Sequence, residues 1–128
     1  MSVPEKNPAA DHPGTAPDDN QVPASATGVL TIDLDALAAN WRKLEKTAVP
    51  AECAGVIKAD AYGCGIPPVA RTLAAAGCKT FFVATLAEAK AARAALPDTA
   101  ALYVLSGFFQ NTGDDYARVN CRPVIGDL

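Results

Sequence analysis

Apolar and polar residues follow two different periods along the chain, and the changes between them predict an α/β fold. Short runs that are apolar throughout predict four buried strands, at residues 53–59, 80–84, 101–107 and 122–126. A further β-prone run, "VLTIDL", covers residues 29–34. Between these runs, apolar residues recur on one face at helical spacing. Apolar strands separated by one-faced helices are typical of a parallel sheet that helices cover.

The predicted helices have clear boundary signals. Asp33 is an expected N-cap for a helix that carries Leu34, Ala38 and Trp41 on one face and ends before Pro50. The next helix is expected to begin at Pro67 and Pro68 and to stop at Gly77. "TLAE", residues 85–88, predicts a capping box for a helix through Leu96, and a weaker helix is expected around residues 114–119.

The predicted strands recur at intervals of roughly 20 to 25 residues, which suits both a doubly wound sheet and a (β/α)8 barrel. A barrel typically takes about 250 residues. The last apolar run is followed by no helical segment, so we expect the front part of a longer protein. A small complete domain with four strands is the alternative.

Composition divides the chain near residue 28. Residues 1–28 are rich in proline and poor in large apolar side chains, which predicts a disordered N-terminal extension. Residues 29–128 form the expected folded domain. His12, the only histidine, lies in the extension, where nothing would hold a catalytic geometry.

Charge and cysteine usage exclude several classes of protein. The net charge of −3 gives no basic footprint for a nucleic-acid partner, and no apolar run reaches the roughly 20 residues of a membrane span. The four cysteines form no C-x-x-C pair, so we expect no structural zinc. Reduced thiols and the lack of a visible secretory signal predict a cytoplasmic protein.

Lys58 is the candidate for chemistry because it ends an apolar strand. In α/β folds the carboxyl ends of the strands face the active site, and desolvation there favours a neutral amine that can attack a carbonyl. A snorkelling lysine is the alternative. Gly63 and Gly65 permit positive φ. A cofactor with an aldehyde and a phosphate would suit this segment, with Tyr62, the loop amides and the helix start near Ile66 for the phosphate.

The segment "VIKADAYGCG" closely resembles the signature of the alanine racemases, in which a lysine binds pyridoxal 5'-phosphate (PLP). Seven residues match it in register: Val56, Lys58, Ala59, Ala61, Tyr62, Gly63 and Gly65. The segments "TIDLDALAANWRKL" and "FFVATLAEAKAARAAL" are similar to other parts of the same domain. Cys64 departs from the family, which usually has histidine there; a benign substitution or a reactive thiol would explain it.

The resemblance implies the N-terminal part of a PLP-binding (β/α)8 TIM-type barrel, incomplete in this chain, from an enzyme that interconverts L- and D-alanine for peptidoglycan. Lys58 would be the Schiff-base lysine and one of two acid/base residues, and Tyr62 would bind the cofactor phosphate. The second base, a tyrosine of the partner in a homodimer, lies beyond these residues, so they alone should be inactive. Tyr103 and Tyr116 are assigned to the core and a loop.

Three other functions remain open on this reading. A racemase for serine or a broader set of amino acids would share the fold. An amino-acid decarboxylase would lack the Ala-Tyr-Gly-x-Gly continuation after the lysine. A PLP-binding barrel protein without catalytic activity would lack Tyr62, Gly63 and the second glycine.

Overall fold

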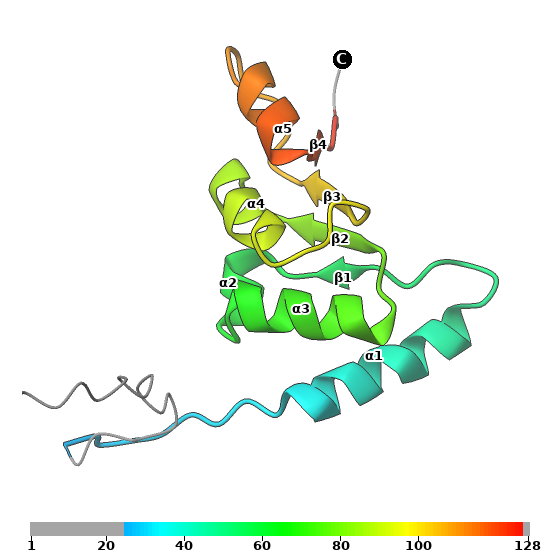
Figure 1. The fold of residues 1–128 in the computed structure, drawn as a ribbon, viewed down its shortest axis with the longest axis vertical. Helices are drawn as coiled ribbons and strands as arrows, with labels where there is room; N and C mark the ends of the chain where they lie inside the picture. The colour runs from blue at the N-terminus through cyan, green and yellow to red at the C-terminus, as the bar shows by residue number, and fades with distance from the viewer. Residues whose placement is uncertain (1–24, 127–128) are drawn as a thin grey trace, which may run out of the picture. The chain divides into compact units, whose positions relative to one another are not determined.

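Four parallel strands in chain order form the sheet of the computed structural model, which describes residues 25–126 (Figure 1). They are β1 (Gly55–Val56), β2 (Thr80–Val83), β3 (Ala101–Val104) and β4 (Arg122–Pro123). Within the described residues the strand order never reverses, whereas a doubly wound sheet reverses at its switch point. The observed order is that of a barrel, so the expected fold class is confirmed.

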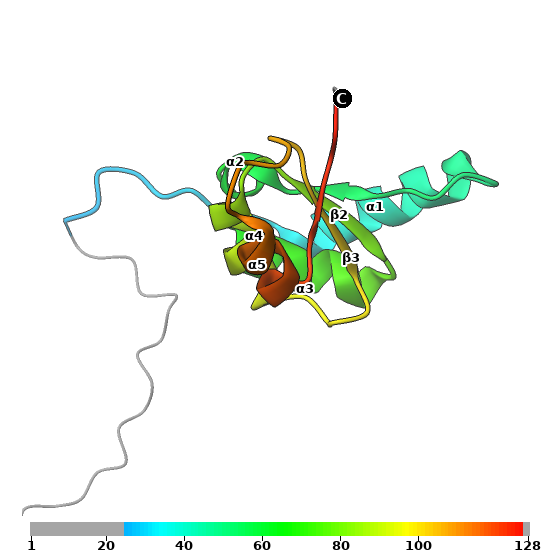
Figure 2. The ribbon, with the colours of Figure 1, turned by 90° about the horizontal axis from the view of Figure 1, so that it is seen from above.

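The sheet lies wholly in the compact unit that begins at Ile32. This unit also holds α1 (Leu34–Ala48), α3 (Ile66–Ala76), α4 (Leu86–Arg93) and α5 (Gly113–Val119). Helices α3, α4 and α5 lie on one side of the sheet (Figure 2), and α1 packs against α3. None of the helices between residues 25 and 126 combines the length and the apolar character that a membrane span requires.

The two faces of the sheet differ in burial. Phe81 and Val83 of β2 and Leu102 and Val104 of β3 are almost fully buried against the helices. The alternate residues form the other face, where Phe82 stacks on Tyr103 with ring centroids 5.1 Å apart. This alternation places the core between sheet and helices.

Local signals set the helix boundaries correctly. Asp33 caps α1 by accepting the Ala36 N–H at 2.8 Å. Gly77 ends α3 in the left-handed conformation, as a C-terminal glycine commonly does. Thr85 and Glu88 form both halves of the expected capping box. Helix α4 ends at Arg93 instead of Leu96, because the chain tightens there: the Ala95 N–H donates to Ala92 O, three residues back.

The β-prone run at residues 29–34 does not form a strand. Val29 and Leu30 are exposed, and no described residue pairs with this segment as a neighbouring strand. A β-prone run without a partner for its backbone groups has no sheet to join. The strand expected at 53–59 is also shorter, since the chain leaves the sheet at Lys58. Most of the extension expected at 1–28 lies outside the described residues.

Candidate active site

Lys58 lies immediately beyond the carboxyl end of β1. The Ile57 N–H makes the last bond to β2, donating to Phe82 O at 2.8 Å, and the Ile57 side chain is 1% exposed. Lys58 follows at the rim of the sheet, half-buried, with its Nζ 5.9 Å from the ring centroid of Tyr62. The structure therefore places the lysine where α/β barrels carry out their chemistry.

The backbone after Lys58 makes a left-handed turn, labelled α2 (Lys58–Tyr62). Ala59, Asp60 and Ala61 have φ values of 51 to 53°, and Tyr62 follows with φ 55°. For L-residues this conformation costs about 1–2 kcal/mol each. Four in succession cost roughly 4–8 kcal/mol by the same rule, so the surroundings must hold the turn.

Positive φ was expected only at Gly63 and Gly65, and both glycines have it, at 84° and 87°. The four residues before them were missed by sequence reasoning. The only local signal was weak: alanine is small, and aspartate is enriched in the left-handed region.

Two carboxylates hold this turn. Asp60 Oδ1 accepts the Ile66 N–H at 2.8 Å, which ties the turn to the start of α3. Glu88 Oε1 accepts the Ala59 N–H, also at 2.8 Å, which ties it to α4. Ala61 is 5% exposed and packs in the core. Lys58 therefore lies on a strained segment that is fixed at several points.

The start of α3 cannot serve the phosphate as expected. Pro67 and Pro68 have no N–H, so Ile66 is the only residue of the first three helical positions with a donor. That donor is already bound to Asp60. A carboxylate at this position also repels a second anion. The expectation that this helix start binds a phosphate is therefore wrong.

Tyr62 and Cys64 lie on the same segment and line the same groove, but Tyr62 is the more exposed of the two. Tyr62 is 64% exposed, so its side chain is open to a ligand. Cys64 is half-buried, packs against the core and lines a groove with Trp41 and Leu73. This packing favours a benign replacement of the histidine usual in the family.

The two later tyrosines differ from their assignments. Tyr103, expected in the core, lies on the open face of the sheet, where its hydroxyl accepts a hydrogen bond from Arg122 at 3.0 Å. Tyr116, expected in a loop, is buried in α5 and donates to Gly107 O at 2.6 Å. Burial raises the pKa of the Tyr116 hydroxyl. Its helical face carries it into the core, which the short, weak helical pattern did not reveal.

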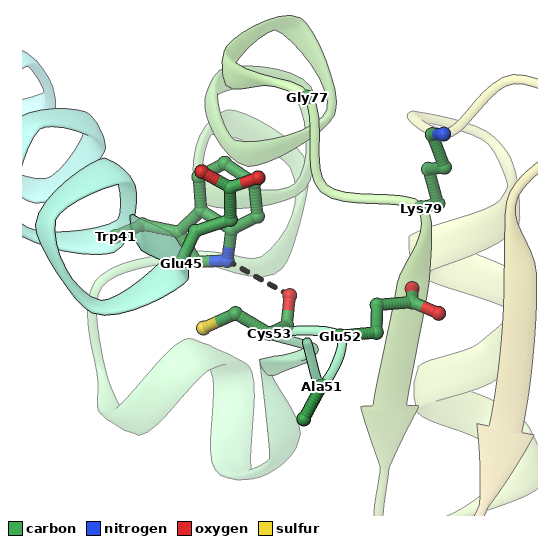
Figure 3. Close-up of a pocket in the computed structure, with 7 residues that line it drawn as sticks. All are labelled: Trp41, Glu45, Ala51, Glu52, Cys53, Gly77 and Lys79. Carbon is green, nitrogen blue, oxygen red and sulfur yellow. Dashed lines mark hydrogen bonds between the residues drawn. The ribbon is translucent and has the colours of Figure 1, made fainter. Parts of the chain in front are cut away.

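A separate pocket of about 180 Å³ lies at the opposite end of the strands (Figure 3). Trp41 and Glu45 of α1 border it, together with Cys53 before β1 and Lys79 before β2. Trp41 Nε1 donates to Cys53 O at 3.2 Å. Because the amino-terminal end of a barrel serves stability, this pocket is not the catalytic site.

The fold and the site together define an α/β-barrel segment with a candidate lysine nucleophile at the catalytic end of its first described strand. The family model for the alanine racemase N-terminal domain matches residues 32–128, so the chain belongs to the alanine racemase family. The resemblance seen in the sequence is confirmed.

Individual relatives agree with this assignment. The chain is 60% identical over 97 residues to an alanine racemase of Methylobacterium nodulans, covering 76% of this chain and 26% of the relative. It is 45% identical over 103 residues to a catabolic alanine racemase of Rhizobium johnstonii, covering 80% and 27%. The crystal structure of alanine racemase from Bartonella henselae, with covalently bound pyridoxal phosphate, superposes with a TM-score of 0.68 at 40% identity, covering 72% and 26%. The chain thus spans about a quarter of these proteins.

Proposed function

We propose that residues 29–128 form the first part of the barrel of a PLP-dependent alanine racemase, an isomerase of L- and D-alanine. The observation that carries this proposal is the position of Lys58, at the carboxyl end of β1 on a fixed turn. The comparison with relatives supports the same proposal, because the chain is 60% identical over 97 residues to a protein named alanine racemase.

The residues present fit the aldehyde end of PLP. The Lys58 amine is partly exposed, and neither ion pair found within residues 25–126 involves it. An amine without an anionic partner is available to a carbonyl. For the phosphate end the chain offers Tyr62, whose side chain is exposed and four residues from the lysine. The remaining phosphate contacts would come from other parts of the protein.

Lys58 would hold the cofactor and then move a proton at the α-carbon of alanine, as one of two acid/base residues. PLP, when bound, supplies an electron sink for the charge that develops at that carbon. The second base would be a tyrosine of a partner subunit in a homodimer. We also infer a cytoplasmic location, which suits the four free cysteines.

The test is to change Lys58→Ala and Lys58→Arg in the complete gene product. After incubation with PLP and borohydride, we expect the reduced pyridoxyl label on Lys58 in the wild type and on neither variant. Racemisation of alanine should be lost in both, and arginine should keep the local fold because it retains length and charge. A label on another side chain, or full activity of either variant, would refute the proposal.

The substrate and the biological role need separate measurements. Turnover of alanine, serine and lysine side by side would distinguish an alanine racemase from one for serine or a broader set. PLP binding without turnover would indicate a barrel that is not catalytic. Supply of D-alanine to peptidoglycan predicts that deletion of the gene causes a D-alanine requirement. The Rhizobium johnstonii relative is named a catabolic alanine racemase. If the role is catabolic, deletion of the gene should instead impair growth on alanine.

A further inference from the structure

We propose that Glu88 is the positioning residue for Lys58: its carboxylate fixes the left-handed turn on which the lysine lies. This inference rests on the proposed function, because it concerns the residue that would hold PLP. It assigns to α4 a role in the site that its capping box alone does not indicate.

The geometry separates two tasks between the two oxygens of Glu88. Oε2 faces its own helix start, accepting the Ala84 N–H at 2.8 Å and the Thr85 N–H at 3.4 Å. Oε1 accepts the Ala59 N–H at 2.8 Å, across 29 positions of sequence. The capping box needs only the first oxygen. The second is used for the residue next to Lys58.

The bond to Ala59 is placed where the strain begins. Ala59 is the first residue with positive φ after the lysine. The next three residues, none of them glycine, have the same conformation. A hydrogen bond to an ionised acceptor is about twice as strong as a neutral one. The Ala59 N–H belongs to the peptide group that follows the Cα of Lys58. Holding this N–H therefore fixes the backbone directly beside the atom that carries the lysine side chain. Asp60 holds the other end of the turn through Ile66.

The variant Glu88→Gln distinguishes the effect of the carboxylate from the effect of side-chain size. Glu88→Gln keeps the length of the side chain but has one acceptor oxygen and an NH2 group. Whichever way the amide turns, its NH2 group meets the N–H of Ala59 or that of Ala84, so one donor loses its partner. Thr85→Ala is the matched control. It removes the other half of the capping box, in which Thr85 Oγ1 accepts the Glu88 N–H at 3.2 Å, and leaves the bond to Ala59 intact.

The experiment uses the complete gene product in its PLP-free form and follows hydrogen exchange of the peptide spanning residues 58–66. Loss of a charge-assisted bond predicts exchange roughly tenfold to a hundredfold faster in Glu88→Gln. In Thr85→Ala, exchange of this peptide should stay at the wild-type rate while α4 exchanges faster. Borohydride labelling of Lys58 at low PLP concentration should fall by about tenfold in Glu88→Gln only.

Each outcome decides the matter. Equal acceleration in both variants would show that Glu88 acts only through the stability of α4, and unchanged exchange in Glu88→Gln would show that Ala59 needs no clamp; both overturn the inference. Faster exchange with unchanged labelling also overturns it, because the turn would then not position the amine. Failure of the proposed function is distinguishable, since the wild type itself would then carry no label on Lys58.

Discussion

The two glycines after the lysine turn provide a quantitative test of the local backbone, because they are unlike each other. Gly63 has φ 84° and ψ 3°, which lies in the left-handed region, and a Cβ added there would meet nothing within 4 Å. Gly65 has φ 87° and ψ 117°, outside that region. A Cβ there would lie 3.2 Å from Cγ of Pro68. Alanine is thus strained at Gly63 and both strained and crowded at Gly65.

The cost of each substitution follows from these angles. Alanine in the left-handed region costs about 1–2 kcal/mol, and the loss of glycine's freedom in the unfolded chain returns about 0.4–1 kcal/mol. Gly63→Ala should therefore reduce the free energy of unfolding by roughly 0.8 kcal/mol, the difference between the middles of these two ranges. At Gly65 the unfavourable region costs up to about 3 kcal/mol, and contact with the rigid Pro68 ring adds to it. We expect a loss of about 3 kcal/mol for Gly65→Ala.

Urea denaturation of the complete gene product, followed by tryptophan fluorescence, measures the difference. Trp41 packs in the same core as α3, next to Gly77, so its fluorescence reports on this segment once any tryptophans outside these 128 residues are replaced by phenylalanine. Comparing the shifts of the two midpoints removes the dependence on the common slope. A midpoint shift at least twice as large for Gly65→Ala is expected. Equal shifts would refute the backbone conformation described for this segment.

Two further predictions concern residues away from the site. Arg93 donates to four carbonyls, those of Val119 at 3.1 Å, Pro97 and Asn120 at 2.8 Å and Ala100 at 2.9 Å. Arg93→Lys should reduce the free energy of unfolding by about 2–3 kcal/mol in urea denaturation, because an ammonium cannot reach all four carbonyls. The control is Arg118→Lys, at a side chain 73% exposed, where we expect a change near zero. Equal losses in the two variants would contradict a stabilising role for the four hydrogen bonds of Arg93. Burial raises the pKa of the Cys78 thiol. The unfolded chain then loses this proton first as the pH rises, so the contribution of this thiol to stability should be constant below about pH 8.5 and fall above it. Cys78→Ala should flatten that fall in urea midpoints taken from pH 7 to 10, and an unchanged fall would exclude this thiol as the cause.

The helices could be predicted because their signals are local. Asp33 and Thr85 each accept a backbone N–H three residues ahead, so the cap lies within a few positions of the helix it starts. Gly77 ends α3 through its own φ of 114°. Parallel strands could also be predicted, since short apolar runs separated by one-faced helices are typical of a parallel sheet. Such features depend on neighbours in sequence, and sequence reasoning reads them directly.

The geometry of the site could not be predicted, because it depends on distant contacts. The left-handed turn after Lys58 is held in part by Glu88, which is 29 positions from its partner Ala59. "TLAE" predicted the capping box and contained no sign of this second contact. The absence of a strand at residues 29–34 has the same cause. β propensity is a local property, but a strand forms only where a neighbouring strand pairs with it, and the sequence does not show which segments pair.

The lysine segment combines requirements that act on different residues at once. Ile57 must be apolar because it is fully buried at the end of β1. Ala61 must be small because it is both buried and left-handed. Asp60 must accept the Ile66 N–H, and Gly65 must adopt a conformation that strains any other residue. Each requirement has a separate physical origin, so the backbone beside Lys58 is constrained by burial, by a hydrogen bond and by its left-handed conformation at once. A reactive amine benefits from such support, because catalysis depends on its position before the substrate arrives.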